Sequence, residues 1–306
     1  MLQRIAARIL RRSTGPSDAF PALPTTPCRS IEEFERFMLQ NSAEWGARAA
    51  REASIACSDG PFTVPGWCVV CRAHTEFEVG YNHCFVGPDG GRVPNWREHL
   101  TCRGCGLNNR MRAAFHFLLQ GAGARGTLYL TEQVTPLFRA VSAAVPRTTG
   151  SEFLRDGTRP GALDAQGRRH EDLASLSFAD RSFDRIGCFE VLEHMPDHLP
   201  ALRQIRRCLV PGGTLLLTVP FALDRVGHVE RAKLGADGTV EHILPAEYHG
   251  DPLDGAGVLC FRHFGWALLA ELDAAGFEEP ALHFYWSSEL GHLGGPQFIV
   301  AARRPR

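Results

Sequence analysis

The chain has 306 residues, of which 44% are hydrophobic and 22% are charged, a composition that suits a globular protein with one sizeable core and a second small domain. Its formal net charge of -1 at pH 7 argues against a nucleic-acid footprint over the whole protein, but not against a local basic patch. No apolar run approaches the roughly 20 residues that span a bilayer, so we expect no transmembrane segment.

The first 29 residues are expected to be a basic N-terminal segment and a linker. Residues 1–12 are basic and carry Ile5, Ile9 and Leu10, but they lack the apolar core and cleavage site of a signal peptide. They suggest a loosely docked helix, with a membrane-surface helix as the alternative. Residues 13–27 are rich in proline, serine and threonine, which is typical of linkers.

A helix is predicted next, over residues 30–54. Ser30, followed three residues later by Glu33, forms a capping box at its start. Ile31, Phe34 and Met38 then recur on one helical face, so we expect this face to be buried.

Residues 55–112 carry cysteines, glycines and prolines and show little helical periodicity. Two Cys-x-x-Cys pairs, 30 residues apart, consist of Cys68, Cys71, Cys102 and Cys105. Each pair brings two thiolates round a tight turn, and two such turns complete a tetrahedral zinc site that stabilises the fold. Gly104 and Gly106 give the second turn its backbone freedom. We therefore predict a four-cysteine zinc ribbon, with the alternative ligands His74, His83 and Cys84.

The ten cysteines come without a secretion signal, which indicates reduced thiols and a cytoplasmic location. Five arginines surround the second cysteine pair, and they either form an anion-binding face or solvate a small domain. These are Arg92, Arg97, Arg103, Arg110 and Arg112. Trp96 is expected to pack against the ribbon or the following domain.

From residue 113 to residue 306 strands and helices alternate, which predicts an α/β fold with a parallel sheet. The expected strands are 127–130, 148–153, a short third one that ends near Asp172, 183–192, 215–219, 281–286 and 297–301. Three helices are expected. The first begins at Pro136, after Thr135 as N-cap, and the other two cover 197–209 and 263–275, the last one capped by His263. Residues 221–262 are too long for an ordinary connection and are predicted to be a substrate-side insertion.

The most specific stretch runs from Phe183 to Pro220. It starts FDRIGCFEVLEHMPD, continues through an amphipathic helix and ends LVPGGTLLLTVP. This stretch strongly resembles the second half of class I S-adenosylmethionine (SAM) dependent methyltransferases of the type 11-like group. The resemblance covers roughly residues 126–306, and it implies a Rossmann-like, seven-stranded methyltransferase sheet with SAM as the cofactor.

The resemblance also implies the cofactor contacts, which lie outside the carboxyl ends of the strands. Glu152, after the second strand, is expected to bridge the ribose hydroxyls. Asp172 is expected to receive the adenine amino group, beside the backbone amide of Leu173. Glu190 and Val191, at the end of the fourth strand, are placed near the methionine moiety.

The first motif departs from the family. The family has an acidic residue and then Gly-x-Gly after the first strand, because glycines let the backbone approach the cofactor closely. Here Thr131, Glu132 and Gln133 continue into Val134-Thr135-Pro136 without a glycine. Glu132 or Thr131 is expected to replace the acid that binds the methionine ammonium group, and the helix that starts at Pro136 offers unpaired amides.

Methyl transfer from a sulfonium is an in-line displacement, so a base is needed only where the acceptor must lose a proton. The candidate catalytic bases are His194, at the mouth of the pocket beside Glu193, and His249 in the insertion. Other histidines of the insertion, His228 and His242, are further candidates. The same histidines could bind a second metal, although no ligand spacing in the sequence indicates one.

We expect methylation of a small-molecule, glycan or lipid-linked acceptor, and we favour O-methylation. The fourth strand lacks the Asn-Pro-Pro-Tyr type of motif that holds a flipped base, and no Pro-Cys follows it. Two alternatives stay open. The missing glycines suggest a methyltransferase-fold scaffold protein without catalysis, and the arginines suggest an RNA methyltransferase that grips RNA with its ribbon. The sequence does not indicate the oligomeric state.

Overall fold

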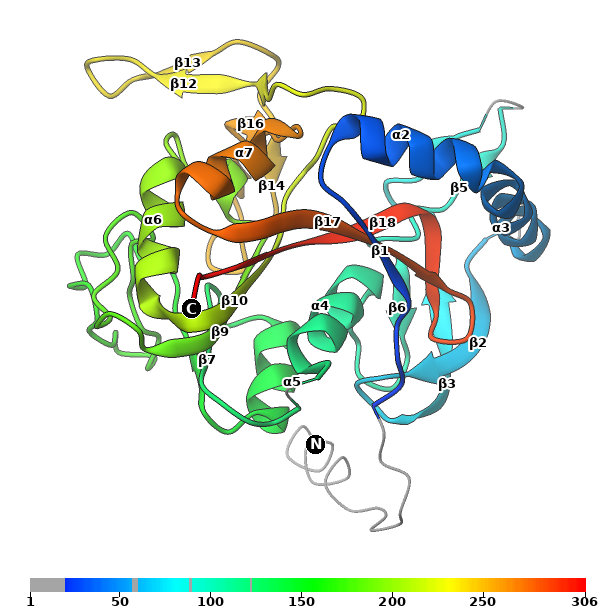
Figure 1. Cartoon of the computed structure of the whole chain (residues 1–306), viewed down its shortest axis with the longest axis horizontal. Coiled ribbons are helices and arrows are strands. Elements are labelled where there is room, and N and C mark those ends of the chain that lie inside the picture. The colour runs from blue at the N-terminus through cyan, green and yellow to red at the C-terminus, as the bar shows by residue number, and fades with distance from the viewer. Residues whose placement is uncertain (1–19, 57–59, 88–89, 122) are drawn as a thin grey trace.

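A seven-stranded mixed sheet forms the centre of the protein, with helices on both faces (Figure 1). A computed structural model describes residues 20–56, 60–87, 90–121 and 123–306, so the helix predicted over residues 1–12 lies outside the described residues. The strand order is β1-β17-β18-β10-β9-β7-β8. The strands are β1 (Thr25–Cys28), β7 (Leu128–Leu130), β8 (Thr148–Gly150), β9 (Phe183–Phe189), β10 (Leu209–Thr218), β17 (Glu278–Ser287) and β18 (His292–Arg303). The predicted Rossmann-like sheet is confirmed.

The four strands β8, β7, β9 and β10 run parallel, and their two faces are both covered. Successive residues of a strand point to opposite faces, so Leu215 and Leu217 of β10 join one core cluster and Leu216 joins the other. This is why the sequence of β10 is apolar without alternation. The covering helices are α2 (Ile31–Gln40), α6 (Leu199–Cys208) and α7 (Ala267–Ala274) on one face, and α4 (Asn109–Leu119) and α5 (Pro136–Ala144) on the other.

The predicted N-terminal linker contains a strand of the central sheet. Thr25–Cys28 pairs antiparallel with β17 at the edge of the sheet, where a proline such as Pro27 is tolerated. Residues 25–28 are therefore part of the methyltransferase-like sheet and not of a linker.

The single helix predicted over residues 30–54 is two helices, α2 and α3 (Ser42–Ile55), which meet at Asn41. The predicted start is confirmed, since Ser30 Oγ accepts a hydrogen bond of 3.2 Å from the amide of Glu33.

The predicted third strand is reduced to one parallel bridge between Glu152 and His170. Three glycines with positive φ interrupt the segment between them, at 157, 161 and 167. Such residues favour turns over a continuous strand. The sheet still has seven strands because β1 adds to the opposite edge.

The cysteine segment forms a three-stranded sheet of β2 (Phe62–Cys68), β3 (Ala73–Val79) and β6 (Leu100–Cys102), with a hairpin of β4 (Phe85–Val86) and β5 (Arg92–Val93). It packs against the β17–β18 hairpin. Arg112 of α4 is fully buried and donates hydrogen bonds to the carbonyls of Leu100, Leu290 and Gly291. Trp96 is buried in the same cluster as Leu293, as predicted. The ribbon and the central sheet therefore share a continuous interior.

The insertion forms three small two-stranded sheets, in which β11 pairs with β16, β12 with β13 and β14 with β15. The strands are β11 (Val229–Glu230), β12 (Ala232–Leu234), β13 (Val240–His242), β14 (Tyr248–His249), β15 (Val258–Leu259) and β16 (Arg262–His263). The predicted cap role of His263 is wrong. His263 lies in β16, its Nε2 bonds Glu247 at 2.8 Å, and α7 starts after Trp266. None of the described helices has the length and apolarity of a membrane span.

Candidate active site

The carboxyl ends of the four strands meet at one edge of the sheet because the strands run parallel. Most of the predicted cofactor residues follow these ends directly. They are Thr131, Glu132 and Gln133 after β7, Glu152 two residues after β8, and Glu190 and Val191 after β9. Asp172 and Leu173 follow the bridge at His170 instead of a regular strand. The residues predicted from separate motifs are therefore gathered at one edge.

The glycine-free loop after β7 is held by Glu152. The Oε1 atom of Glu152 accepts hydrogen bonds from the amides of Gln133 at 2.7 Å and Val134 at 2.9 Å. The side chain of Gln133 continues the network, since it donates to the carbonyl of Gly167 and accepts from the amide of Arg169. Gln133 is thus a residue that shapes the loop, and only one oxygen of Glu152 is used by the loop.

Gly150, the last residue of β8, makes the close approach of this loop possible. A Cβ atom at this position would lie 2.4 Å from Cε2 of Phe138 and 2.6 Å from the carbonyl oxygen of Glu132. Both distances are far below van der Waals contact, so a glycine is required here although the loop itself has none.

Glu132 is a buried acid with one unsatisfied oxygen. Its Oε2 accepts a hydrogen bond from the hydroxyl of Thr135, whereas Oε1 has no partner among the described residues. Burial raises the pKa of Glu132 to about 7. A ligand ammonium group at Oε1 would satisfy this oxygen and stabilise the charged form, so the residue fits the role expected for the acid of the first motif.

Asp172 and Leu173 lie in a turn. The Oδ1 atom of Asp172 accepts a hydrogen bond of 2.8 Å from the amide of Ala174, and the side chain of Leu173 is buried in the core. Asp172 is half-buried, so part of its carboxylate stays accessible at this edge.

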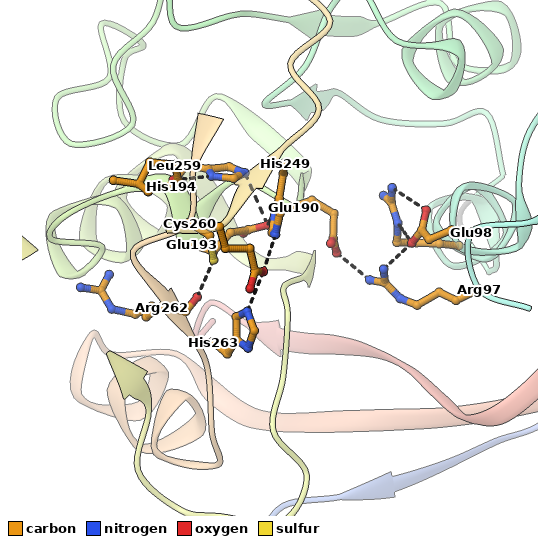
Figure 2. Close-up of polar contacts among 12 residues, drawn as sticks. Arg97, Glu98, Glu190, Glu193, His194, His249, Leu259, Cys260, Arg262 and His263 are labelled. Carbon is orange, nitrogen blue, oxygen red and sulfur yellow. Dashed lines mark hydrogen bonds and ion pairs between the residues drawn. The ribbon is translucent and has the colours of Figure 1, made fainter. Parts of the chain in front are cut away.

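Glu190 connects the sheet edge to the cysteine segment (Figure 2). It has a φ of 55°, and its carboxylate pairs with Arg97 at 2.6 Å. Glu98 pairs with both Arg97 and Arg110. Burial alone would raise the pKa of Glu190, but Arg97 and Arg110 outweigh burial and lower it to about 2.

The other arginines near the second cysteine pair also have partners. Arg112 is buried as described above, Arg92 stacks on Tyr81 at 4.4 Å, and Arg103 pairs with Glu76 at 3.0 Å. Arg97, Arg110 and Arg112 are therefore engaged in contacts within the protein, whereas Arg92 and Arg103 are exposed. An anion-binding face formed by the exposed arginines stays a prediction. The alternative, surface solvation, describes Arg92 and Arg103.

Both predicted catalytic histidines lie beside Glu193 (Figure 2). Leu192–His194 is a 3-10 turn after β9, and His249 comes from β14 of the insertion. The rings of His194 and His249 are 5.0 Å apart. Nε2 of His194 and Nδ1 of His249 lie 3.7 and 3.6 Å from the same oxygen, Oε1 of Glu193. These distances are too long for hydrogen bonds.

Three residues that sequence reasoning did not assign to the site complete this cluster. Glu247 accepts from Nε2 of His249 at 2.9 Å and from His263, and Cys260 lies within 4.8 Å of His249 and Glu247. In the absence of a bound ion, the hydrogen-bonding groups of Cys260, Glu193 and Glu247 raise the pKa of His249. No motif in the sequence marks Glu247, Cys260 or His263, because they come together only through the pairing of β14 with β15.

A family model described as a methyltransferase domain matches residues 121–279, just over half of the chain. The chain belongs to the class I SAM-dependent methyltransferases. It is 29% identical over 159 residues to 27-O-demethylrifamycin SV methyltransferase of Amycolatopsis mediterranei (strain S699). This match covers 44% of this chain and 58% of the relative. It is 43% identical over 86 residues to a ubiquinone biosynthesis O-methyltransferase of Xanthomonas campestris pv. campestris (strain B100), 25% of this chain and 35% of the relative. The chain thus spans less than two thirds of either relative.

Among solved structures, this chain is similar to a SAM-dependent methyltransferase from Mesorhizobium loti, with a TM-score of 0.39 and 18% sequence identity. The similarity covers 63% of this chain and 97% of that one.

The four predicted zinc ligands of the cysteine segment come together. Cys68, Cys71, Cys102 and Cys105 place their sulfur atoms within 4.8 Å of one another, with 3.8 Å between Cys68 and Cys105 and 3.7 Å between Cys71 and Cys102. Two glycines shape the second turn. Gly106 has a φ of 75°, and a Cβ atom on Gly104 would lie 2.9 Å from Cys71 Sγ. The alternative ligands His74, His83 and Cys84 are not part of this cluster.

In a second histidine–carboxylate group, all the polar side-chain atoms are hydrogen-bonded within the protein. His198 and His228 each bond one oxygen of Glu271, at 2.7 and 3.0 Å. Their other ring nitrogens are bonded to Arg262 and to the amide of Gly265. His228, a further base candidate, is therefore a structural residue. His242 lies in the exposed β12–β13 hairpin.

Proposed function

We propose that this protein transfers a methyl group from SAM to a hydroxyl group of a small-molecule acceptor. The single observation that carries the proposal is the pair of histidines, His194 and His249, at the carboxyl edge where the family binds its cofactor. One relative is a ubiquinone biosynthesis O-methyltransferase, and the other is a 27-O-demethylrifamycin SV methyltransferase. Both names favour an oxygen acceptor.

When bound, SAM supplies a methyl group on a sulfonium; transfer forms the bond from carbon to the acceptor oxygen, breaks the bond from carbon to sulfur and leaves S-adenosylhomocysteine. The residues present fit this group. Glu132 would bind the methionine ammonium with its unsatisfied Oε1, and the free oxygen of Glu152 would bind the ribose hydroxyls. Asp172 and the amide of Leu173 would bind the adenine, and Thr131, Glu190 and Val191 would line the methionine end.

The acceptor hydroxyl loses its proton during transfer, and His194 is the residue placed to take it. Its Nδ1 is held by the carbonyl of Leu259 at 2.9 Å and donates to it, which leaves the lone pair on Nε2. His249 is fixed by Glu247 and fills the far side of the cluster.

The test is a titration of the purified protein with SAM and with S-adenosylhomocysteine, followed by an assay of S-adenosylhomocysteine release with a panel of hydroxyl compounds. We expect micromolar cofactor binding that Glu132→Gln, Glu152→Gln and Asp172→Asn each weaken at least tenfold. The exposed Asp156→Asn is the control and should bind like wild type. Absence of binding at millimolar SAM would refute the proposal and favour the scaffold alternative. Three of the five arginines that suggested the RNA alternative, Arg97, Arg110 and Arg112, are engaged in contacts within the protein, which weighs against it.

We also propose that the four cysteines hold one structural zinc ion. In a tetrahedral site with bonds of about 2.3 Å, neighbouring sulfur atoms are about 3.8 Å apart. The two measured separations, 3.8 and 3.7 Å, support this geometry. Metal analysis should give one zinc per chain in protein purified without chelator, and Cys71→Ser should lose it. A stoichiometry near zero would refute the assignment.

A further inference from the structure

We propose that Glu193, His194 and His249 form a second metal site, which holds a divalent transition-metal ion at the acceptor end of the active site. The ion would bind the acceptor oxygen. Its role in catalysis therefore rests on the proposed function, but the binding of the ion itself does not.

The carboxylate of Glu193 is the observation that points to a missing ligand. Its side chain is fully buried, and neither Oε1 nor Oε2 has a hydrogen-bond partner among the described residues. An unsatisfied buried polar group costs about 1–3 kcal/mol, and more when it is charged, so proteins retain such groups mainly where a ligand completes them. The two histidine nitrogens at 3.6 and 3.7 Å approach Oε1 without bonding it.

The separations fit a shared ion better than direct contact. With metal bonds of about 2.1 Å to nitrogen and oxygen, donors 3.6 to 3.7 Å apart subtend about 120° at the metal. The donor atoms of the three residues all lie within 4.8 Å of one another. A small ion between them would reach all three with small movements of the half-buried rings.

Both histidines are oriented as metal ligands are. A ligating histidine commonly donates its second ring N–H to a carbonyl or a carboxylate, which fixes the tautomer and the ring plane. Here Nδ1 of His194 is bonded to the carbonyl of Leu259 at 2.9 Å, and Nε2 of His249 is bonded to Glu247 at 2.9 Å. The remaining nitrogens both face Glu193 (Figure 2).

The second histidine–carboxylate group of the same domain provides the contrast. In it, both oxygens of Glu271 and all four ring nitrogens of His198 and His228 are hydrogen-bonded within the protein. That group needs no ion. The group around Glu193 has the same residue types but leaves the carboxylate unsatisfied.

Two histidines and one carboxylate favour zinc, iron(II), cobalt(II) or manganese(II), and three protein ligands leave positions open. An acceptor hydroxyl bound there would ionise more easily and release its proton to water. Its oxygen would then attack the methyl carbon, and the carbon–sulfur bond would break to give S-adenosylhomocysteine. With the ion bound, His194 serves as a ligand and no longer as the proton acceptor.

The probe is cobalt(II), added to protein whose four-cysteine site is already filled with one equivalent of zinc, without SAM or acceptor. We expect a second equivalent to bind with visible d–d absorption but without the intense thiolate charge-transfer band that a four-cysteine site gives. Glu193→Gln, which is isosteric and removes no hydrogen bond, should weaken this binding at least tenfold, and so should His249→Gln. Glu271→Gln is the matched control and should keep both equivalents.

Binding of only one equivalent at millimolar cobalt, or unchanged cobalt affinity in Glu193→Gln, would overturn the proposal. Retained zinc in each variant reports that the protein is folded. If cobalt binds as expected but no hydroxyl compound is methylated, the metal site is supported and the proposed function fails. If protein that holds only the ribbon zinc methylates a hydroxyl as fast as the fully loaded protein, the role of the second ion is overturned while the proposed function stands.

Discussion

The ion pair between Arg97 and Glu190 should couple the cysteine ribbon to the carboxyl edge of the central sheet. The two residues are 93 positions apart, and their side chains meet at 2.6 Å with exposed fractions of 31% and 20%. Because both are partly shielded from water, the pair should contribute more than an exposed surface pair does. The perturbation is a double-mutant cycle of Arg97→Met and Glu190→Gln.

The magnitude follows from the pKa of Glu190, which is about 2 instead of 4.5. A difference of about 2.5 pKa units corresponds to about 3.4 kcal/mol of interaction with the charged form. Arg97 and Arg110 share this stabilisation, which also offsets the cost of burial, so we expect a coupling free energy of about 2 kcal/mol between Arg97 and Glu190 at pH 7. The stabilisation is complete above pH 4.5 and is lost as the pH falls towards 2, because the folded-state pKa of the acid is depressed.

Urea denaturation of the four proteins of the cycle at pH 7 measures the coupling, and repetition at pH 3 should give a smaller value. The matched control is the pair of Arg103 and Glu76 in the same ribbon, which is 59% and 55% exposed and should couple by less than about 1 kcal/mol. A coupling between Arg97 and Glu190 no larger than that of the control would refute the reasoning.

Three further predictions concern stability. Burial lowers the pKa of His116 to about 4, so its neutral form stabilises the fold fully above about pH 6.5, and this stabilisation is lost as the pH falls through 4. Between pH 7 and pH 4, the free energy of unfolding of His116→Gln should therefore fall by about 3 kcal/mol less than that of wild type. Urea denaturation at both pH values measures the difference. Gly150→Ala should cost about 1–3 kcal/mol through its clash with Phe138 and weaken SAM binding, while Gly46→Ala, which has no atom within 4 Å, should be neutral or stabilising in thermal unfolding. Arg112→Met leaves three buried carbonyls without a donor and should destabilise by about 3–5 kcal/mol; a loss below 1 kcal/mol would contradict this.

The parts of the fold that the sequence predicts well are those fixed by local patterns. The unit from β9 through α6 to β10 follows from apolar runs, a helical period and a Pro-Gly-Gly turn, all within 40 residues. The cysteine cluster follows from spacing alone, since a two-residue gap between thiols already defines the turn that brings them together.

The parts that sequence reasoning missed depend on partners far along the chain. The strand Thr25–Cys28 lies in a proline-rich segment and exists because β17, about 250 residues later, offers an edge to pair with. The arginines of the ribbon have the same sequence signature whether they face solvent or a half-buried glutamate, so only the structure distinguishes Arg97 from Arg103. Glu247 and Cys260 likewise reach His249 through the folding of the insertion.

The glycine-free first loop shows how a missing motif can be compensated at another position. In the family, glycines allow the backbone to approach the cofactor, but here the amides of Gln133 and Val134 already donate to Glu152, and the close approach occurs at Gly150 on the neighbouring strand. These two amides are therefore not available to a ligand. Recognition of the methionine end must then depend on side chains, above all on the unsatisfied oxygen of Glu132. In a family member with the glycine motif, backbone amides share the binding of the methionine end with the acid. We therefore expect Glu132→Gln to weaken SAM binding more in this chain than loss of the corresponding acid would in such a family member.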